Sequence, residues 1–205
     1  MKVLLINGSP HMKGCTYTAL KEVSDTLNKE GIETEIIHVG NKDIRGCIGC
    51  RQCKTKGHCV FNDLVNEVAP KFTEADGIVI GSPVYFASAN GTLVSFIDRL
   101  FYSTPGDKTM KVGASVVSAR RAGTTATFDE LNKYFTISGM PVVSSRYWNM
   151  VHGNTPEEVK QDQEGLLNMR ILGRNMAFLM KSIELGKKEY GMPEVEEHIF
   201  TNFIR

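Results

Sequence analysis

The sequence predicts an α/β protein built on a doubly wound, five-stranded parallel sheet with a C-terminal helical extension. Short, continuous apolar runs recur along the chain, and segments with helical periodicity separate them. Strands that are buried on both faces and joined by helices are typical of a parallel sheet with helices on both sides. The 205 residues, 41% of them hydrophobic, suffice for one domain with a well-buried core.

The first half of the chain predicts three strands. They lie at 3–6, at 33–39 and at 77–80, where the third ends in Gly81-Ser82-Pro83. A helix from about 16 to 29 separates the first two and stops at Gly31. A second helix precedes the third strand, and Asn62 or Asp63 can cap it. Its apolar positions are Val65, Val68 and Phe72.

The second half predicts two further strands and the extension. The fourth strand covers 112–117, and the fifth opens at Pro141-Val142-Val143 and ends near Trp148. Helices are expected at 91–101 and 128–137, and Thr155-Pro156 is a strong helix start. We therefore assign residues 1–149 to the sheet domain and 150–205 to a packing helix and oligomerisation arm. The extension helix carries apolar positions at Leu172, Met176, Leu179 and Ile183.

Composition and charge exclude several partners. Lys and Arg number 24 against 23 Asp and Glu, so the formal charge of +1 gives no electrostatic case for nucleic acid or an anionic membrane. No stretch reaches the roughly 18 apolar residues of a membrane span. Met1 leads directly into the first strand without a signal sequence, so we predict a cytoplasmic protein.

Four of the five cysteines lie within residues 47–59, with the spacing C-x2-C-x2-C-x5-C. Two-residue gaps let successive thiolates converge on one face of a tight loop, as in the runs that hold iron-sulfur clusters. We predict an Fe4S4 cluster. A metal-free thiol loop, a zinc site and disulfides are the alternatives, with disulfides the weakest because nothing indicates an oxidising compartment. The predicted ligands are Cys47, Cys50, Cys53 and Cys59.

The loop after the first strand, residues 7–16, is rich in small residues and opens a helix. Backbone amides at a helix N-terminus, together with the Ser9 and Thr16 hydroxyls, suit a phosphate. The loop is neither G-x-G-x-x-G nor G-x-x-x-x-G-K-[ST], which disfavours a dinucleotide fingerprint and a nucleoside-triphosphate loop. Alone it is weak evidence, because Gly-Ser-Pro after a strand is often only a turn.

The loop after the third strand carries a family resemblance. The segment Gly81-Ser82-Pro83-Val84-Tyr85-Phe86 runs into a helix with Phe96-Ile97-Asp98-Arg99. Across residues 2–145 the chain resembles the NADPH-dependent FMN reductases of flavodoxin-like fold, whose strand order is 2-1-3-4-5. Together with the cysteine run, it is similar to the iron-sulfur flavoprotein branch of that family.

The resemblance implies FMN, with its phosphate in the first loop and its ring against the backbone of 83–87. His11 and Cys15 replace the Arg and Asn expected there, which removes a permanent positive charge that Lys13 could restore. Tyr85 and Phe86 could stack on the ring or a neighbouring subunit, or be core residues. The expected FMN contacts in these two loops are Ser9, His11, Lys13, Gly14, Cys15, Thr16, Pro83, Val84, Tyr85, Phe86, Ala87 and Asn90.

A third loop follows the fourth strand, and the resemblance brings it to the pyrimidine side of the flavin. Its candidate contacts are Ser118, Arg120, Gly123 and Thr124. Arg120 could stabilise the anionic reduced ring, or the segment could be a solvated basic turn; the two readings stand equal. For Asp98 and Arg99 we favour a structural role, as a helix ion pair or interface contacts.

These observations predict a flavin-dependent oxidoreductase in which an Fe4S4 cluster relays electrons from a one-electron donor such as ferredoxin to FMN. Oxygen, peroxide or a quinone-like molecule would be the acceptor, and no acid-base catalytic residue is nominated. A cluster-free NAD(P)H-dependent FMN or quinone reductase is the first alternative. A non-catalytic, redox- or metal-sensing flavin module is the second. The resemblance also predicts a homodimer or homotetramer.

Overall fold

The computed structural model describes residues 1–194, 196, 197, 199 and 201. Its centre is a parallel sheet in the order β2-β1-β3-β5-β6, and a two-residue strand, β4, pairs antiparallel with β3. Counted along the parallel path, this is the predicted order 2-1-3-4-5. The strands are β1 (Lys2–Asn7), β2 (Glu33–His38), β3 (Gly77–Tyr85), β4 (Ser88–Ala89), β5 (Val112–Ala119) and β6 (Met150–His152).

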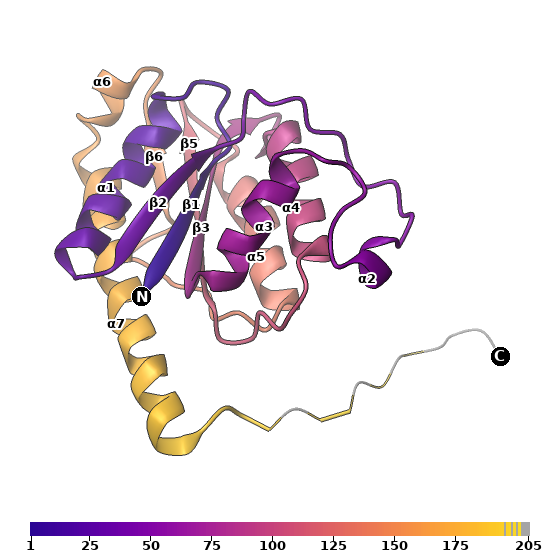
Figure 1. Cartoon of the computed structure of the whole chain (residues 1–205). Coiled ribbons are helices and arrows are strands. Elements are labelled where there is room, and N and C mark those ends of the chain that lie inside the picture. The colour runs from indigo at the N-terminus through magenta and orange to yellow at the C-terminus, as the bar shows by residue number, and fades with distance from the viewer. Residues whose placement is uncertain (195, 198, 200, 202–205) are drawn as a thin grey trace.

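Helices cover both faces of this sheet (Figure 1). On one face lie α1 (Cys15–Lys29) and α7 (Gln163–Tyr190), which pack against each other. On the other lie α3 (Leu64–Glu74), α4 (Gly91–Ser103) and α5 (Thr124–Ile137). Two short helices, α2 (Cys53–Lys56) and α6 (Pro156–Val159), stand outside these layers.

The alternation of side chains along β1 explains why the sheet needs both layers. Leu4 and Ile6 enter the core under α3, α4 and α5, whereas Val3 and Leu5 enter the core under α1 and α7. All four side chains have no exposed surface. A strand that is apolar on both faces can only be central in a three-layer arrangement.

The register places the ends of β1 and β2 at one edge of the sheet, beside the middle of β3. Asn7, the last residue of β1, pairs with His38 at the end of β2 and with Gly81 within β3. The loops after β1 and β2 therefore leave from the same carboxyl edge, where ligands of such sheets bind.

Two strands differ from expectation. β3 continues through Pro83 to Tyr85, because β1 ends opposite Gly81 and leaves that side of Pro83 without a hydrogen-bonding partner. The fifth strand was placed wrongly: Val142 makes only an isolated bridge with Gly113, and the paired strand is Met150–His152. It lies just beyond residue 149, where the first segment was expected to end.

The extension forms the long helix α7. Leu172 and Met176 are buried against α1, and Leu179 and Ile183 pack partly against the same core. The predicted cap at Thr155 accepts a hydrogen bond from Glu158 N, but it begins only the single turn of α6. The end of α7 projects beyond the sheet (Figure 1). Among the described residues, no helix is long and apolar enough to cross a membrane. Residues 195, 198, 200 and 202–205 of the predicted arm lie outside the described residues.

Candidate functional site

The loop after β1 is held in shape by its own side chains. Asn7, fully buried, accepts a hydrogen bond from Ser9 N at 3.1 Å and donates one to Met12 O at 3.0 Å. Ser9 Oγ in turn accepts from His11 N. From the end of β2, His38 Nε2 lies 2.7 Å from Ser9 O, to which it must donate, while the buried Nδ1 has no partner among residues that the structure describes. Asn7 and His38 were not predicted as site residues, because each looks like the polar end of a strand.

The N-terminus of α1 suits an anion. Its cap is Gly14, which contributes no side-chain hydrogen bond, and the first turn contains no acidic residue. The amides of the first turn therefore lack intrahelical partners and carry the positive end of the helix dipole. An open hollow of about 520 Å³ lies here, lined by Pro10–Cys15, Asn154 and Pro156. The sequence did not indicate the last two, which lie far along the chain.

Cys15 lines this hollow, whereas Thr16, the next residue of α1, is buried beneath it. The buried Thr16 hydroxyl lies 2.8 Å from Ser118 Oγ, which ties the first loop to the end of β5. The Cys15 thiol donates to Gly153 O at 3.6 Å. Burial raises the pKa of Cys15, and Glu158 and Glu157 raise it further. Cys15 is thus held as a neutral thiol.

The second loop is a tight hairpin between β3 and β4. Tyr85 pairs with Ser88, and the two residues between them, Phe86 and Ala87, both have positive φ (52° and 60°). Left-handed backbone at two successive non-glycine residues is strained, and such strain concentrates at functional sites. Phe86 is fully exposed at the tip, so it is no core residue, and Tyr85 is 44% exposed.

The third loop lies against this hairpin. Gly123 has φ +88°, and a Cβ there would approach Val84 Cγ1 to 2.9 Å and Ala87 Cα to 3.0 Å. Below it, Glu130 of α5 accepts hydrogen bonds from Ser88 Oγ and Ala89 N. The structure therefore brings the second and third loops together, as expected. Arg120 is exposed beside them.

The four loop cysteines line one hollow on the side of α4. All are free thiols; Cys47 and Cys50 are exposed, and Cys53 and Cys59 are partly buried. Val60, Phe61, Arg99 and Tyr102 complete much of the wall. Within the described part of the chain, no three His, Cys, Asp or Glu side chains are already placed to hold a metal ion. The donor set of four free thiols around one hollow fits a thiolate-bound cluster in its chemistry.

The cysteine loop begins at the same edge of the sheet as the first loop and ends away from it. It leaves β2 at that edge, where Gly40 lies so close to the first loop that a Cβ would reach Ser9 C at 2.2 Å. It then runs outward to α2, beside α4 (Figure 1). Asn90, which directly follows the hairpin, is the N-cap of α4, and Arg99 of the same helix lines the hollow of the cysteines. One helix therefore connects the two sites.

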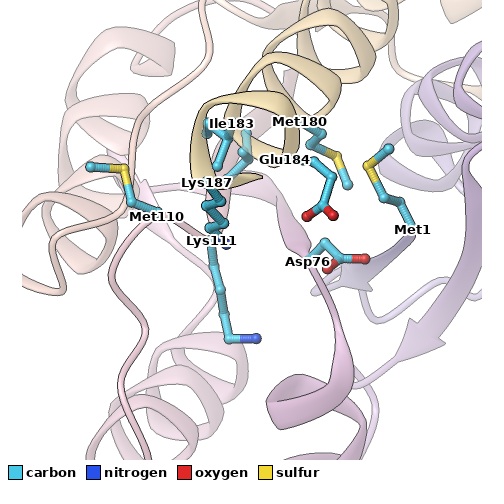
Figure 2. A pocket seen from close by; sticks show the side chains of 9 residues that line it. Met1, Asp76, Met110, Lys111, Met180, Ile183, Glu184 and Lys187 are labelled. Atoms are coloured by element: carbon cyan, nitrogen blue, oxygen red, sulfur yellow. The ribbon is translucent and has the colours of Figure 1, made fainter. Parts of the chain in front are cut away.

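A different hollow lies at the opposite edge, near the starts of β1, β3 and β5 (Figure 2). Its volume is about 70 Å³, and Met1, Asp76, Met180 and Glu184 are among its lining residues. Lys111 extends away from α7 and donates to Thr73 O and Ala75 O, so it caps the end of α3 (Figure 2). No loop of the candidate site reaches this edge, and we assign the hollow no role in the chemistry.

Comparison with known proteins agrees with the geometry. Residues 1–155 match the family model for NADPH-dependent FMN reductase. An iron-sulfur flavoprotein of Methanocaldococcus jannaschii is 36% identical over 192 residues, which cover 90% of this chain and 100% of that protein. The chain belongs to the iron-sulfur flavoproteins of the NADPH-dependent FMN reductase family.

Solved structures of lower identity support the fold of this iron-sulfur flavoprotein. RosB, solved with a bound 8-demethyl-8-formylriboflavin-5'-phosphate intermediate, is 18% identical, with a TM-score of 0.72 over 100% of this chain and 94% of RosB. A flavodoxin from the domain Archaea is 16% identical, with a TM-score of 0.59 over 88% of this chain and 99% of the flavodoxin. The flavodoxin-like fold is confirmed, and the family confirms FMN and a flavin-dependent oxidoreductase. The role of each residue stays a prediction.

Proposed function

We propose that this protein is an FMN-dependent electron-transfer oxidoreductase that also holds an Fe4S4 cluster on Cys47, Cys50, Cys53 and Cys59. Electrons would enter from a one-electron donor such as ferredoxin and leave to oxygen, peroxide or a quinone-like acceptor. When bound, FMN supplies one- and two-electron exchange and the cluster supplies one-electron exchange. The proposal rests on one observation: all four free thiols line the same hollow. That hollow lies beside α4, the helix that begins where the flavin hairpin ends.

The first loop supplies the phosphate site in this proposal. The free amides of the α1 N-terminus bind the anion, and Asn7, Ser9 and His38 keep the loop open by saturating its backbone groups. Lys13, exposed at the hollow, supplies the positive charge of the Arg that the family resemblance leads us to expect in this loop. Thr16 orients its hydroxyl through Ser118.

The hairpin and the third loop supply the ring site. The strained backbone of Phe86 and Ala87 presents Tyr85 and Phe86 outward, where they can cover one face of the flavin. Gly123 lets the third loop approach without a side chain in the gap, and Arg120 stands beside it to stabilise negative charge on the ring. Glu130 fixes the base of the hairpin.

The flavin itself provides a first test. A single phosphate loop without a dinucleotide fingerprint predicts FMN rather than FAD. Flavin released by denaturation should be FMN when identified by chromatography. Stoichiometric FAD would contradict the assignment of the loop.

The proposed electron entry is tested with Cys50→Ala. This change removes an exposed thiol from the ligand set and leaves the flavin loops untouched. We expect a yellow, FMN-loaded protein that dithionite reduces normally but that reduced ferredoxin reduces far more slowly than the parent. Thr55→Ala is the matched control, because Thr55 lies in the same loop and its exposed hydroxyl bonds, among the described residues, only to Gln52 O.

The competing function is a cluster-free NAD(P)H-dependent reductase. The exposed hairpin favours this alternative, since hydride transfer needs an open flavin face. Equal ferredoxin rates in Cys50→Ala and the parent, with fast reduction of both by NADPH, would put this alternative first.

A further inference from the structure

Arg99 is the largest fully buried side chain of the protein's described part, with 1% of its surface exposed. A charge so placed must be compensated, because burial of an isolated guanidinium is costly. Asp63 provides the compensation: Nη1 and Nη2 donate to its two carboxylate oxygens at 2.6 and 2.9 Å. Asp63 also caps α3 through Val65 N, so the pair joins α4 to α3.

The remaining donors of Arg99 point at the cysteine loop. Nε donates to Cys59 Sγ at 3.3 Å, and Nη1 also donates to Arg45 O at 3.2 Å. Arg45 lies just before the first cysteine, so one guanidinium holds both flanks of the loop. Burial alone would lower the pKa of Arg99, but Asp63 and Cys59 outweigh it and raise the pKa above its usual value.

Among the described contacts of the loop, Cys59 is the one cysteine whose backbone N–H and carbonyl are both bonded by a side chain. Asn66 accepts from Cys59 N at 3.0 Å and donates to Cys59 O at 2.9 Å and to Phe61 O at 3.0 Å. Cys47 and Cys50 lie on exposed backbone without such a clamp. Of the four proposed ligands, Cys59, the last in the chain, is therefore held in place by its surroundings.

We propose that Arg99 is a positioning residue that holds the Cys59 sulfur toward the hollow and stabilises negative charge on it, with Asp63 fixing the guanidinium. The cluster part of this proposal rests on the proposed function. The structure gives Arg99 the ion pair expected of a structural residue, with Asp63 as its partner, and the positioning role is added to it. Asp98, its neighbour, instead accepts from Tyr134 at 2.5 Å on the other side of the helix.

The charge balance gives the direction of the effect. Four thiolates exceed the charge of one divalent cation by two, so a loaded site is net negative, and a cluster gains one more negative charge on reduction. A buried guanidinium hydrogen-bonded to a ligand sulfur stabilises both states and the reduced state more. Arg99 should therefore strengthen binding of thiolate-seeking metals and raise the reduction potential of the cluster.

Arg45 supplies a matched control. Its guanidinium lies over the same Phe61 ring as that of Arg99, at 4.9 and 5.0 Å from the centroid. Of these two arginines, only Arg99 donates to a cysteine sulfur among the described contacts. Arg45→Met thus removes a second guanidinium from the face of the same Phe61 ring. It leaves both the Cys59 contact and the Arg45 backbone carbonyl in place.

The first measurement is the midpoint potential of the cluster in anaerobically purified protein. Arg99→Met should weaken the preference for the reduced cluster about tenfold, which for one electron lowers the potential by about 59 mV. Arg45→Met should shift it much less. Arg99→Lys, which keeps the charge but lacks the planar fork, should recover part of the shift and serves as the main variant if Arg99→Met does not fold.

The second measurement needs no cluster. Cluster-free, FMN-loaded protein is titrated with Cd²⁺ alone, and thiolate-to-metal absorption is followed. Arg99→Met should bind Cd²⁺ about tenfold more weakly than the parent, and Arg45→Met within about twofold. A parent that carries no iron or sulfide defeats the proposed function, while this titration still decides the role of Arg99.

Equal Cd²⁺ affinity in the parent and in Arg99→Met would overturn the positioning role. Equal losses in Arg99→Met and Arg45→Met would also overturn it, since they would assign the effect to general charge rather than to the bond with Cys59.

Discussion

Thr16 and Ser118 are 102 positions apart, yet their hydroxyls lie 2.8 Å from each other. At the scale of single residues, the site depends on such contacts between segments that are far apart in the chain. The Thr16 hydroxyl is buried on α1 and bonds to Ser118 at the end of β5, so an ordered first loop helps to order the third loop.

Thr16→Ala should weaken FMN by about 1 kcal/mol or more, because it removes a hydroxyl at the phosphate site and leaves Ser118 without its partner. Titration of apoprotein with FMN measures the change. Thr18→Ala is the control: within the described part of the chain, the Thr18 hydroxyl bonds only to O of Gly14, the N-cap one turn earlier. Unchanged FMN affinity in Thr16→Ala would remove Thr16 from the site.

At this scale the sequence reveals residue types but not partners. The spacing of the cysteines is local, so the sequence predicts a candidate ligand set. Arg99 meets Cys59 across 40 positions and Asp63 across 36, and no periodicity links them. Asn66 likewise reads as an ordinary helix residue until the fold places it against the Cys59 backbone.

At the scale of elements, the hairpin and the third loop form one unit. The close approach at Gly123 depends on both the absence of a Cβ and a left-handed backbone. The unit explains how a strand, a turn and a helix N-terminus from separate parts of the chain can present one surface.

Gly123→Ala tests this unit. Left-handed alanine costs about 1–2 kcal/mol, and the clash with Val84 and Ala87 adds to it. Gly31→Ala is the matched control, since Gly31 has φ +80° and no atom lies within 4 Å of the position that a Cβ would take. Urea unfolding should show a larger loss for Gly123→Ala, and only that variant should lose FMN affinity. Equal losses would show that the loops do not depend on this contact.

Strands were predictable where they are apolar on both faces and less so elsewhere. β1 and β5 are continuous buried runs, and their positions follow from the sequence. β3 was cut short because Pro83 reads as a turn, and the structure tolerates it only where β1 has ended. β6 was misplaced because Val142-Val143 has the stronger apolar strand pattern in the sequence. Met150–His152 is a strand because the fold places it beside β5, with which it pairs.

At the scale of the whole molecule, α7 leaves apolar surface uncovered. Phe178 and Leu185, seven positions and so two turns apart, share one side of the helix and are 74% and 67% exposed. Apolar surface of this kind on a projecting helix favours association. The predicted homo-oligomer therefore stays our expectation, with α7 as part of the interface.

Light scattering at micromolar concentration should give at least about twice the 22.8 kDa of one chain. Phe178→Asp with Leu185→Asp should lower the mass toward the monomer. Ile137→Asp, at an even more exposed apolar position on α5, is the control and should leave the mass unchanged. A parent with the mass of a single chain would contradict the prediction.

The central claim is that one chain holds both FMN and a cluster on its cysteine loop. Iron, acid-labile sulfide and flavin analysis of anaerobically purified protein tests it most directly, together with an absorption spectrum. We predict a brown protein with about four iron, about four sulfide and about one FMN per chain. A yellow protein with stoichiometric FMN but without iron and sulfide would contradict the claim.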